Sequence, residues 1–353
     1  MKAGVAIWLD WPLPDCVEVA VAAEAAGFSE VWLPDHYFLR DAYAAQALIA
    51  ERTSRIGLGT AVVSPLLRHP ALLASSVSTI NELSGGRAIM GVGVGGFEFP
   101  TQLLMDVDRP LTIAREAVHI IRELPQGETD IRGERFSAVG AKLVWDGGPF
   151  PVYMAARGPK MLELAGEVAD GVITHGLAQS YVDFCLDRIR MGAERAGRSP
   201  VECELVLMFE VEMRDDMRAA VDHLRPRCTI MAGGEYAESL IPVFGLDPEA
   251  VKPLREAVRA RDPDVGRLVT DEMVHAFAVA GPPEHLASRL QEMADVGVGR
   301  VILVFRGDNP EDTAAKMEQV GKAIAGVQGG SSNERSEAAA DPLALSDPPK
   351  AEG

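Results

Sequence analysis

A short strand, a tight turn and a helix follow one another in residues 151–171, PVYMAARGPKMLELAGEVADG. The turn is Gly158-Pro159, and the proline stands at the first helical position, where its fixed φ and missing N–H are tolerated. The first N–H groups of a helix have no intrahelical partner, and Lys160 places a positive charge beside them. This arrangement predicts a site for a phosphate-like anion at the C-terminal end of a strand, with an ordinary strand-to-helix turn as the alternative.

Two polar side chains, Asp35 and His36, follow the strand predicted at residues 30–33, after one proline. An imidazole titrates near neutral pH and exchanges protons readily, so His36 is a candidate catalytic group with Asp35 as its neighbour. The alternative gives both residues structural roles, with Asp35 as a helix cap and His36 half-buried.

Small residues follow two further strands, in GTAVVSPLLRHP at 59–70 and GVGVGG at 91–96. The second run resembles the GxGxxG dinucleotide motif. However, it follows the fourth strand, and FEFPTQLL does not open a convincing helix, which disfavours a dinucleotide fold. Closely spaced glycines instead allow a backbone to approach a flat ligand.

Short apolar runs alternate with helical patterns along most of the chain. Eight strands are predicted, beginning near residues 5, 30, 56, 88, 152, 172, 203 and 300. Repeated strand–helix units require parallel strands with right-handed crossovers, and eight of them fit a closed (β/α)8 TIM barrel. A doubly wound open sheet is the alternative, but it usually places a glycine-rich loop after its first strand, where this chain has WPLPD.

We expect one barrel domain over residues 1–328, with insertions at about 125–150 and 212–283. The first insertion is predicted to be a loop or hairpin and the second to be mainly helical, and such insertions usually shape the substrate pocket. Residues 329–353 are rich in Gly, Ser, Pro, Ala and acidic residues, so they bury too little apolar area to offset their ordering entropy. We therefore predict a disordered acidic tail.

Composition limits which binding partners and which cellular compartment we expect. The chain has 353 residues, of which 47% are hydrophobic, and a net charge of −18. This charge argues against a general nucleic-acid binder and against docking on an anionic membrane. No CxxC pair occurs, so neither a zinc site nor a redox dithiol is predicted. The N-terminus reads as a first strand and not as a signal peptide, and no apolar run is long enough to span a membrane, so we expect a cytoplasmic protein.

Four runs in matching order resemble one protein family. They are VWLPDH at 31–36, GTAVVSPLLRHP at 59–70, SGGRAIMGVGVG at 84–95 and AARGPKMLELAGEVADGV at 155–172. Together they resemble the luciferase-like flavin and deazaflavin oxidoreductases, and most of all the coenzyme F420-dependent branch that includes the methylenetetrahydromethanopterin reductases. The resemblance covers about residues 1–326. It implies a (β/α)8 barrel with the flavin or deazaflavin ring at its C-terminal mouth.

The same resemblance implies roles for individual residues. It places a non-prolyl cis peptide at Ala61-Val62, where it supports the ring, and Asp35 and His36 near that ring. The residues that it implies around the cofactor are Gly59, Ala61, Val62, Gly95, Gly158, Pro159, Lys160, Thr174 and His175. Some relatives carry a catalytic Glu directly after the GVGxG run, whereas this chain has Gly96 there and Glu98 two residues later. Glu98 is therefore a candidate acid, and oxidation of sugar phosphates or simple alcohols is disfavoured.

The implied function is hydride transfer between C5 of F420 and a small organic substrate such as an iminium, an enone or an imine. An FMN-dependent monooxygenase of the same superfamily and a non-catalytic flavin-binding protein are the alternatives. We expect a small-molecule substrate, no nucleic-acid or membrane partner, no metal and a homodimer.

Overall fold

Eight parallel strands form a closed barrel in the computed structural model, which describes residues 1–36, 38–95, 103, 107–234, 238–305 and 307–328. Neighbouring strands pair in sequence order around the ring, and the pairing of β8 with β9 and of β11 with β1 closes it. The barrel strands are β1 (Lys2–Ala6), β2 (Glu30–Leu33), β3 (Gly57–Thr60), β4 (Ala88–Val92), β7 (Val152–Ala155), β8 (Gly171–Thr174), β9 (Glu204–Met213) and β11 (Arg300–Val304). The predicted (β/α)8 class and its eight strands are confirmed.

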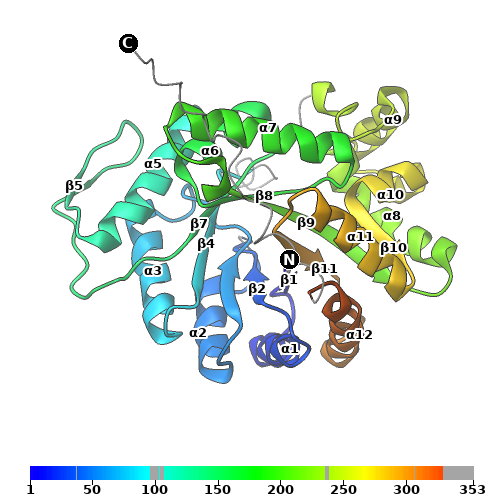
Figure 1. The fold of residues 1–353 in the computed structure, drawn as a ribbon, viewed down its shortest axis with the longest axis horizontal. Coiled ribbons are helices and arrows are strands. Elements are labelled where there is room, and N and C mark those ends of the chain that lie inside the picture. Colours follow the sequence, from blue (N-terminus) through cyan, green and yellow to red (C-terminus); the bar gives the residue numbers. More distant parts are fainter. Residues whose placement is uncertain (37, 96–102, 104–106, 235–237, 306, 329–353) are drawn as a thin grey trace, which may run out of the picture.

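Helices surround the strands (Figure 1). They are α1 (Leu13–Ala25), α2 (Ala42–Arg52), α3 (Pro70–Leu83), α5 (Pro110–Glu123), α6 (Pro159–Val168), α7 (Gln179–Arg195), α8 (Met217–Gly233), α9 (Pro248–Arg259), α10 (Asp271–Phe277), α11 (Pro283–Asp295) and α12 (Pro310–Gln328). Their starts follow the rules of capping. Several begin at a proline, and the Asp41 side chain accepts a 2.8 Å hydrogen bond from the Ala44 N–H at the start of α2.

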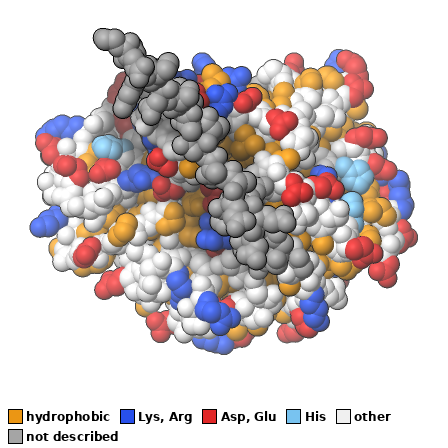
Figure 2. All heavy atoms as spheres, in the orientation of Figure 1, with side chains coloured by type: hydrophobic (Ala, Val, Ile, Leu, Met, Phe, Trp, Pro, Cys, Tyr) orange, Lys and Arg blue, Asp and Glu red, His pale blue; other side chains and the backbone are white. Residues whose placement is uncertain are grey.

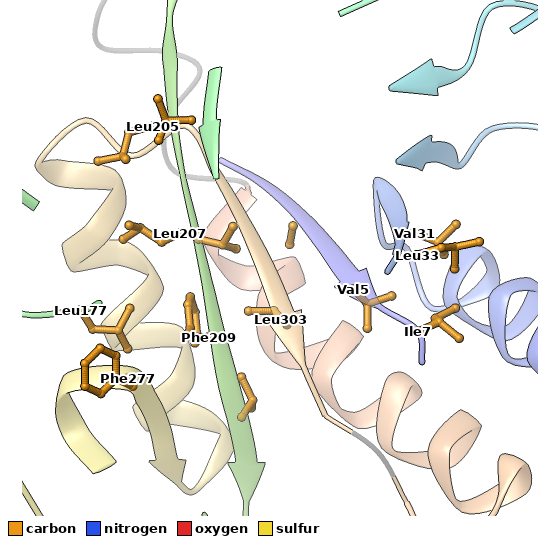
Figure 3. Packing of buried hydrophobic residues seen from close by; sticks show 14 of the residues in the cluster. Val5, Ile7, Val31, Leu33, Leu177, Leu205, Leu207, Phe209, Phe277 and Leu303 are labelled. Carbon is orange, nitrogen blue, oxygen red and sulfur yellow. The ribbon is translucent and has the colours of Figure 1, made fainter. Parts of the chain in front are cut away.

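Two apolar layers hold the barrel together. The outer layer lies between strands and helices, where Leu205, Leu207 and Phe209 of β9 face Leu177 and Phe277 (Figure 3). The inner layer fills the barrel with side chains from alternate positions, namely Ala6, Trp32, Ile89, Tyr153, Ile173, Val206, Met208, Ile302 and Val304. The barrel interior is therefore a packed core, and a ligand site must lie above it at the mouth.

Trp32 dominates the inner layer and requires glycine at two facing positions. A Cβ on Gly59 would lie 2.3 Å from Trp32 Cε3, and a Cβ on Gly4 would lie 2.5 Å from Trp32 Nε1. The rings of Trp32 and Tyr153 meet edge to face, with centroids 5.9 Å apart. In this structure Gly59 thus makes room for an indole, and its predicted contact with a cofactor stays a prediction.

Charged side chains close the N-terminal end of the barrel. Arg300, the first residue of β11, is ion-paired with Glu30 of β2, and its Nε lies 3.0 Å from Oε2 of Glu204 on β9. The Tyr153 hydroxyl donates to the same Glu204 oxygen at 2.8 Å. Only 3% of Glu30 and 7% of Arg300 is exposed to solvent. The network links four strands at the end opposite the mouth.

Two segments depart from the strand–helix repeat. A two-stranded hairpin of β5 (Asp130–Ile131) and β6 (Ala138–Val139) lies within the first expected insertion and packs beside α3 and α5. A further strand that the sequence did not predict, β10 (Ala278–Gly281), pairs in parallel with residues 210–213 of β9, beyond the barrel proper. The apolar run AVAG follows α10 without a turn residue, so the two read as one continuous helical pattern.

The surface mixes charge with apolar side chains. Acidic, basic and apolar side chains are interspersed on the face shown in Figure 2. All four cysteines, Cys16, Cys185, Cys203 and Cys228, are buried and form no disulfide. Within the described ranges, no helix combines the length and the apolar character needed to cross a bilayer.

Candidate active site

Small side chains form the floor of the barrel mouth. Ala61 and Val62, which follow β3, pack on top of the inner apolar layer, and the peptide bond between them is cis, as predicted. On the next strand a Cβ at Gly93 would lie 2.9 Å from both Ala155 Cβ and Val62 Cγ2. Gly95 follows with a φ of +99°, a left-handed conformation that favours glycine. These residues leave a low surface that a flat ring system can approach closely.

The start of α6 offers open backbone donors beside this floor. Gly158 is the N-cap residue, and among the described residues no side chain caps the helix. The N–H groups of Lys160 and Met161 lack the intrahelical partners that an interior helical residue would have. A Cβ on Gly158 would meet no atom of the described residues within 4 Å. A small cavity next to the start of α6 is lined by Gly93, Ala155 and Met161, and by Ala114 of α5.

Arg157 is the cation that the structure adds to this turn. It is half-buried, whereas Lys160 is exposed. The Nη2 atom of Arg157 lies 3.6 Å from the sulfur of Met231 in α8, so the guanidinium lies between the barrel and that helix. Tyr153 faces the barrel interior, so alternation along β7 puts Arg157 on the inward side too. That period of two is a signal from which the sequence could have indicated Arg157.

His175 and Thr174, both predicted at the cofactor, lie on opposite sides of the chain at the end of β8. Burial, together with the positive charge of Arg157, lowers the pKa of His175 to about 3, so its imidazole is neutral at physiological pH. The His175 ring is hydrogen-bonded to the backbone of Met208. Thr174 is buried, and its hydroxyl lies 2.8 Å from that of Tyr181. His175 thus belongs with Arg157, while the Thr174 side chain is engaged by α7.

The side chains of Asp35 and His36 have different neighbours in the structure. Asp35 lies within the electrostatic reach of Arg68 and Asp41, and burial raises the pKa of this carboxyl despite the opposing charge of Arg68. The His36 ring lies 6.3 Å from the ring of Trp8, which follows the inward-facing Ala6 of β1. Burial lowers the pKa of His36, which favours its neutral form. Of the two, His36 is therefore the better placed to meet a ligand in the mouth.

A charged cluster that the sequence did not signal lies at the outer end of β9. Glu212 is buried and accepts a 2.7 Å hydrogen bond from Arg214 Nε. His223 Nε2 of α8 and Lys316 Nζ of α12 lie 3.5 and 3.9 Å from Oε2 of Glu212. These groups come from three elements that only folding brings together. They form a charged cluster at the C-terminal end of β9, between that strand and the helices α8 and α12.

Glu98, the candidate acid, lies outside the described residues, as does the predicted tail at 329–353. Both stay predictions. In the part of the chain that the structure describes, no three His, Cys, Asp or Glu side chains are grouped so that they could hold a metal ion.

These features define a (β/α)8-barrel protein whose candidate ligand site is the C-terminal mouth, with a small-residue floor and a helix start beside it. The chain belongs to the luciferase-like monooxygenase family, whose sequence pattern matches residues 6–300. The family resemblance noted from the four sequence runs is thereby confirmed.

Individual relatives refine this placement. The chain is 33% identical over 318 residues to the 5,10-methylenetetrahydromethanopterin reductase of Methanolobus tindarius, covering 89% of this chain and 97% of that protein. It is 29% identical over 316 residues to the F420-dependent glucose-6-phosphate dehydrogenase of Amycolatopsis mediterranei, covering 83% and 88%. The structure of the coenzyme F420-dependent tetrahydromethanopterin reductase from Methanopyrus kandleri matches with a TM-score of 0.82 at 26% identity, covering 92% of this chain and 98% of that one.

Proposed function

We propose that this protein is an F420-dependent oxidoreductase that transfers hydride between C5 of the deazaflavin and a small organic substrate. The observation that carries the proposal is the open helix start of α6 with Arg157 beside it, next to a floor of small residues. A cofactor with a flat ring and a phosphate needs both parts. The names of the similar reductase and dehydrogenase, which include F420, support this choice of cofactor.

The residues present fit such a cofactor. The N–H groups of Lys160 and Met161 and the guanidinium of Arg157 would hold the phosphate, because backbone donors at a helix start and a nearby cation suit an anion. Ala61, Val62 and Gly93 would support the face of the ring system. When bound, F420 supplies the hydride chemistry, and the protein supplies binding, orientation and electrostatics.

His36 is the side chain that we assign to proton handling. Its pKa is lowered by burial, so at neutral pH the ring carries one N–H donor and one free acceptor nitrogen. Such a group donates a hydrogen bond to a ring carbonyl or exchanges a proton with the substrate. The charged cluster around Glu212 lies at the same end of the barrel and would orient polar parts of the substrate.

Cofactor binding and turnover test this proposal in two steps. Fluorescence quenching would measure the dissociation constants of F420 and FMN side by side, and we expect F420 to bind more tightly. Reduced F420 would then be mixed with a panel of iminium, imine and enone acceptors, and its reoxidation followed by the return of violet absorbance. Micromolar FMN binding without F420 binding would favour the monooxygenase and contradict the proposal. Tight F420 binding with no turnover on any acceptor would favour a non-catalytic binding protein.

Three further expectations from the sequence also stand as proposals: one barrel domain over residues 1–328, a homodimer and a cytoplasmic location. Limited proteolysis tests the first because only the tail should be removed. Sedimentation equilibrium tests the second, and cell fractionation tests the third.

A further inference from the structure

Tyr181, the third residue of α7, connects the two strand ends that flank the proposed phosphate site. Its hydroxyl donates to the backbone oxygen of Arg157 at 3.2 Å and lies 2.8 Å from Oγ1 of Thr174. Arg157 follows β7, and Thr174 is the last residue of β8. The Tyr181 hydroxyl therefore links the turn before α6 to the end of β8 through two hydrogen bonds.

The donor of each hydrogen bond in the series Thr174–Tyr181–Arg157 follows from the atoms that can only accept. A backbone oxygen only accepts, so the proton between Tyr181 and Arg157 belongs to Tyr181. A phenol has one proton, and for both bonds to form the Thr174 hydroxyl must donate to Tyr181. The single Thr174 proton is then committed, and none is left for a phosphate oxygen. This gives Thr174 a different role from the direct cofactor contact that the family resemblance implies.

The bond to Arg157 orients the peptide that opens the phosphate turn. In a trans peptide the C=O of one residue and the N–H of the next point in opposite directions within one plane. Because Tyr181 holds the Arg157 oxygen, the Gly158 N–H is aimed away from Tyr181. We propose that Tyr181 is a positioning residue for the cofactor phosphate, because its hydroxyl sets the direction of the Arg157-Gly158 peptide and so of the donors that follow. This inference rests on the proposed function.

The surroundings of Tyr181 hold its ring still. The side chain is fully buried, and its ring centroid lies 4.3 Å from that of Phe244, which in turn lies 5.1 Å from Phe277. Burial also raises the pKa of the phenol, so the proton that the chain requires is present throughout the functional pH range. Removing only the oxygen would leave this aromatic packing in place.

Tyr181→Phe tests the inference because it deletes the hydroxyl and keeps the ring. Tyr153→Phe is the matched control, since it deletes a buried hydroxyl that bonds Glu204 at the opposite end of the barrel. The probes are F420 and the same deazaflavin shortened to lack its phosphate. We expect Tyr181→Phe to raise the dissociation constant of F420 about five- to tenfold and that of the phosphate-free compound less than about twofold. Tyr153→Phe should change neither.

Two further measurements sharpen the test. Amide hydrogen exchange in residues 157–162, measured without cofactor, should be faster in Tyr181→Phe than in the wild type. Thr174→Val should weaken F420 binding less than Tyr181→Phe does, because Tyr181 still donates to the Arg157 oxygen in that variant.

Several outcomes would overturn the inference. An equal loss of affinity for both deazaflavins would show a general distortion, and an unchanged F420 constant would show that the hydroxyl does not matter. A larger effect from Thr174→Val would show that Thr174 contacts the phosphate itself. Wild-type protein that binds no F420 would overturn the proposed function and this inference with it, and that failure is recognised before any substitution is made.

Discussion

Replacing Arg300 with methionine should destabilise the barrel strongly. Methionine keeps much of the side-chain length but removes the charge that Glu30 and Glu204 share. Both carboxylates would be left near one another at the closed end of the barrel, with Glu30 only 3% exposed. Removing one partner of a buried ion pair typically costs about 3–5 kcal/mol, because the remaining charge stays desolvated.

The contacts of Arg300 support a value near the middle of that range. The 3.0 Å pair with Glu204 alone has a gross Coulomb attraction of about 5 kcal/mol at an effective dielectric constant of 20, before desolvation is subtracted. Arg300 also lies over the Tyr153 ring, with its Cζ 5.4 Å from the centroid, and that contact would be lost too. We therefore expect Arg300→Met to lower the free energy of unfolding by about 4 kcal/mol and the melting temperature by about 6 °C.

Denaturant titration followed by circular dichroism, with a refolding check, measures the change. Arg52→Met is the matched control, since Arg52 and Glu18 are 2.8 Å apart but their side chains are 53% and 59% exposed. A pair so exposed contributes less than about 1 kcal/mol. If Arg300→Met lost no more stability than Arg52→Met, the network would not hold the barrel closed, and the reasoning from burial would be refuted. F420 affinity should be unchanged in both variants, because neither pair lies at the mouth.

Three further predictions concern the barrel and its mouth. Gly91→Ala would place a Cβ 1.9 Å from the Thr60 backbone oxygen, so thermal unfolding should show a loss of stability of about 3 kcal/mol or more. At Gly158 a Cβ meets no described atom within 4 Å, so Gly158→Ala should keep its melting temperature but bind F420 more weakly. Equal melting temperatures for the two variants would contradict this contrast. Lys160→Ala should weaken F420 binding only about two- to fivefold, because the Lys160 side chain is exposed. Titration calorimetry should show that the difference in affinity between wild type and variant shrinks at high salt. A larger loss of affinity that does not depend on salt would mean that Lys160 contacts the phosphate directly. His36→Asn should lower kcat about 100-fold with little change in affinity. Since burial lowers the pKa of His36, wild-type activity that uses the neutral ring should be retained at neutral pH and lost as the pH falls below the usual imidazole range. The Asn variant should lack this dependence, and identical pH profiles would leave His36 without a catalytic part.

Most barrel strands were predictable because they are short apolar runs next to amphipathic helices, as in RVILV at 300–304 between α11 and α12. Strand β10 was not, because the apolar run that continues α10 shows no change of period at Phe277. Its strand geometry comes from pairing with residues 210–213 of β9, which is a tertiary contact. Local pattern identifies a strand only where its ends are marked by turn residues or polar positions.

The same limit applies to the site. The turn at Gly158-Pro159 lies within one contiguous stretch, so residues 151–171 were enough to indicate it. The cis peptide at Ala61-Val62 was implied only by the family resemblance that the run at 59–70 carries. The link from Tyr181 to the Arg157 oxygen joins positions 24 residues apart through a hydroxyl that no motif marks. Charge clusters such as that around Glu212 draw on three separate elements, so the sequence alone does not reveal them.

The long strand β9 has a consequence for the length of the connection that leaves it. Residues 214–277 leave the sheet after Met213 and return at Ala278, which pairs with Glu210, so the segment starts and ends within a few residues of one strand. The Arg214 N–H also donates to the Gly281 oxygen at 3.0 Å, which joins the exit to the return. Each doubling of a loop's length between fixed ends costs only about 0.6 kcal/mol. The entropy of closing the connection therefore places little limit on its length, and the limit on its sequence comes from the side chains that it buries in the core, such as Leu224 and Phe277.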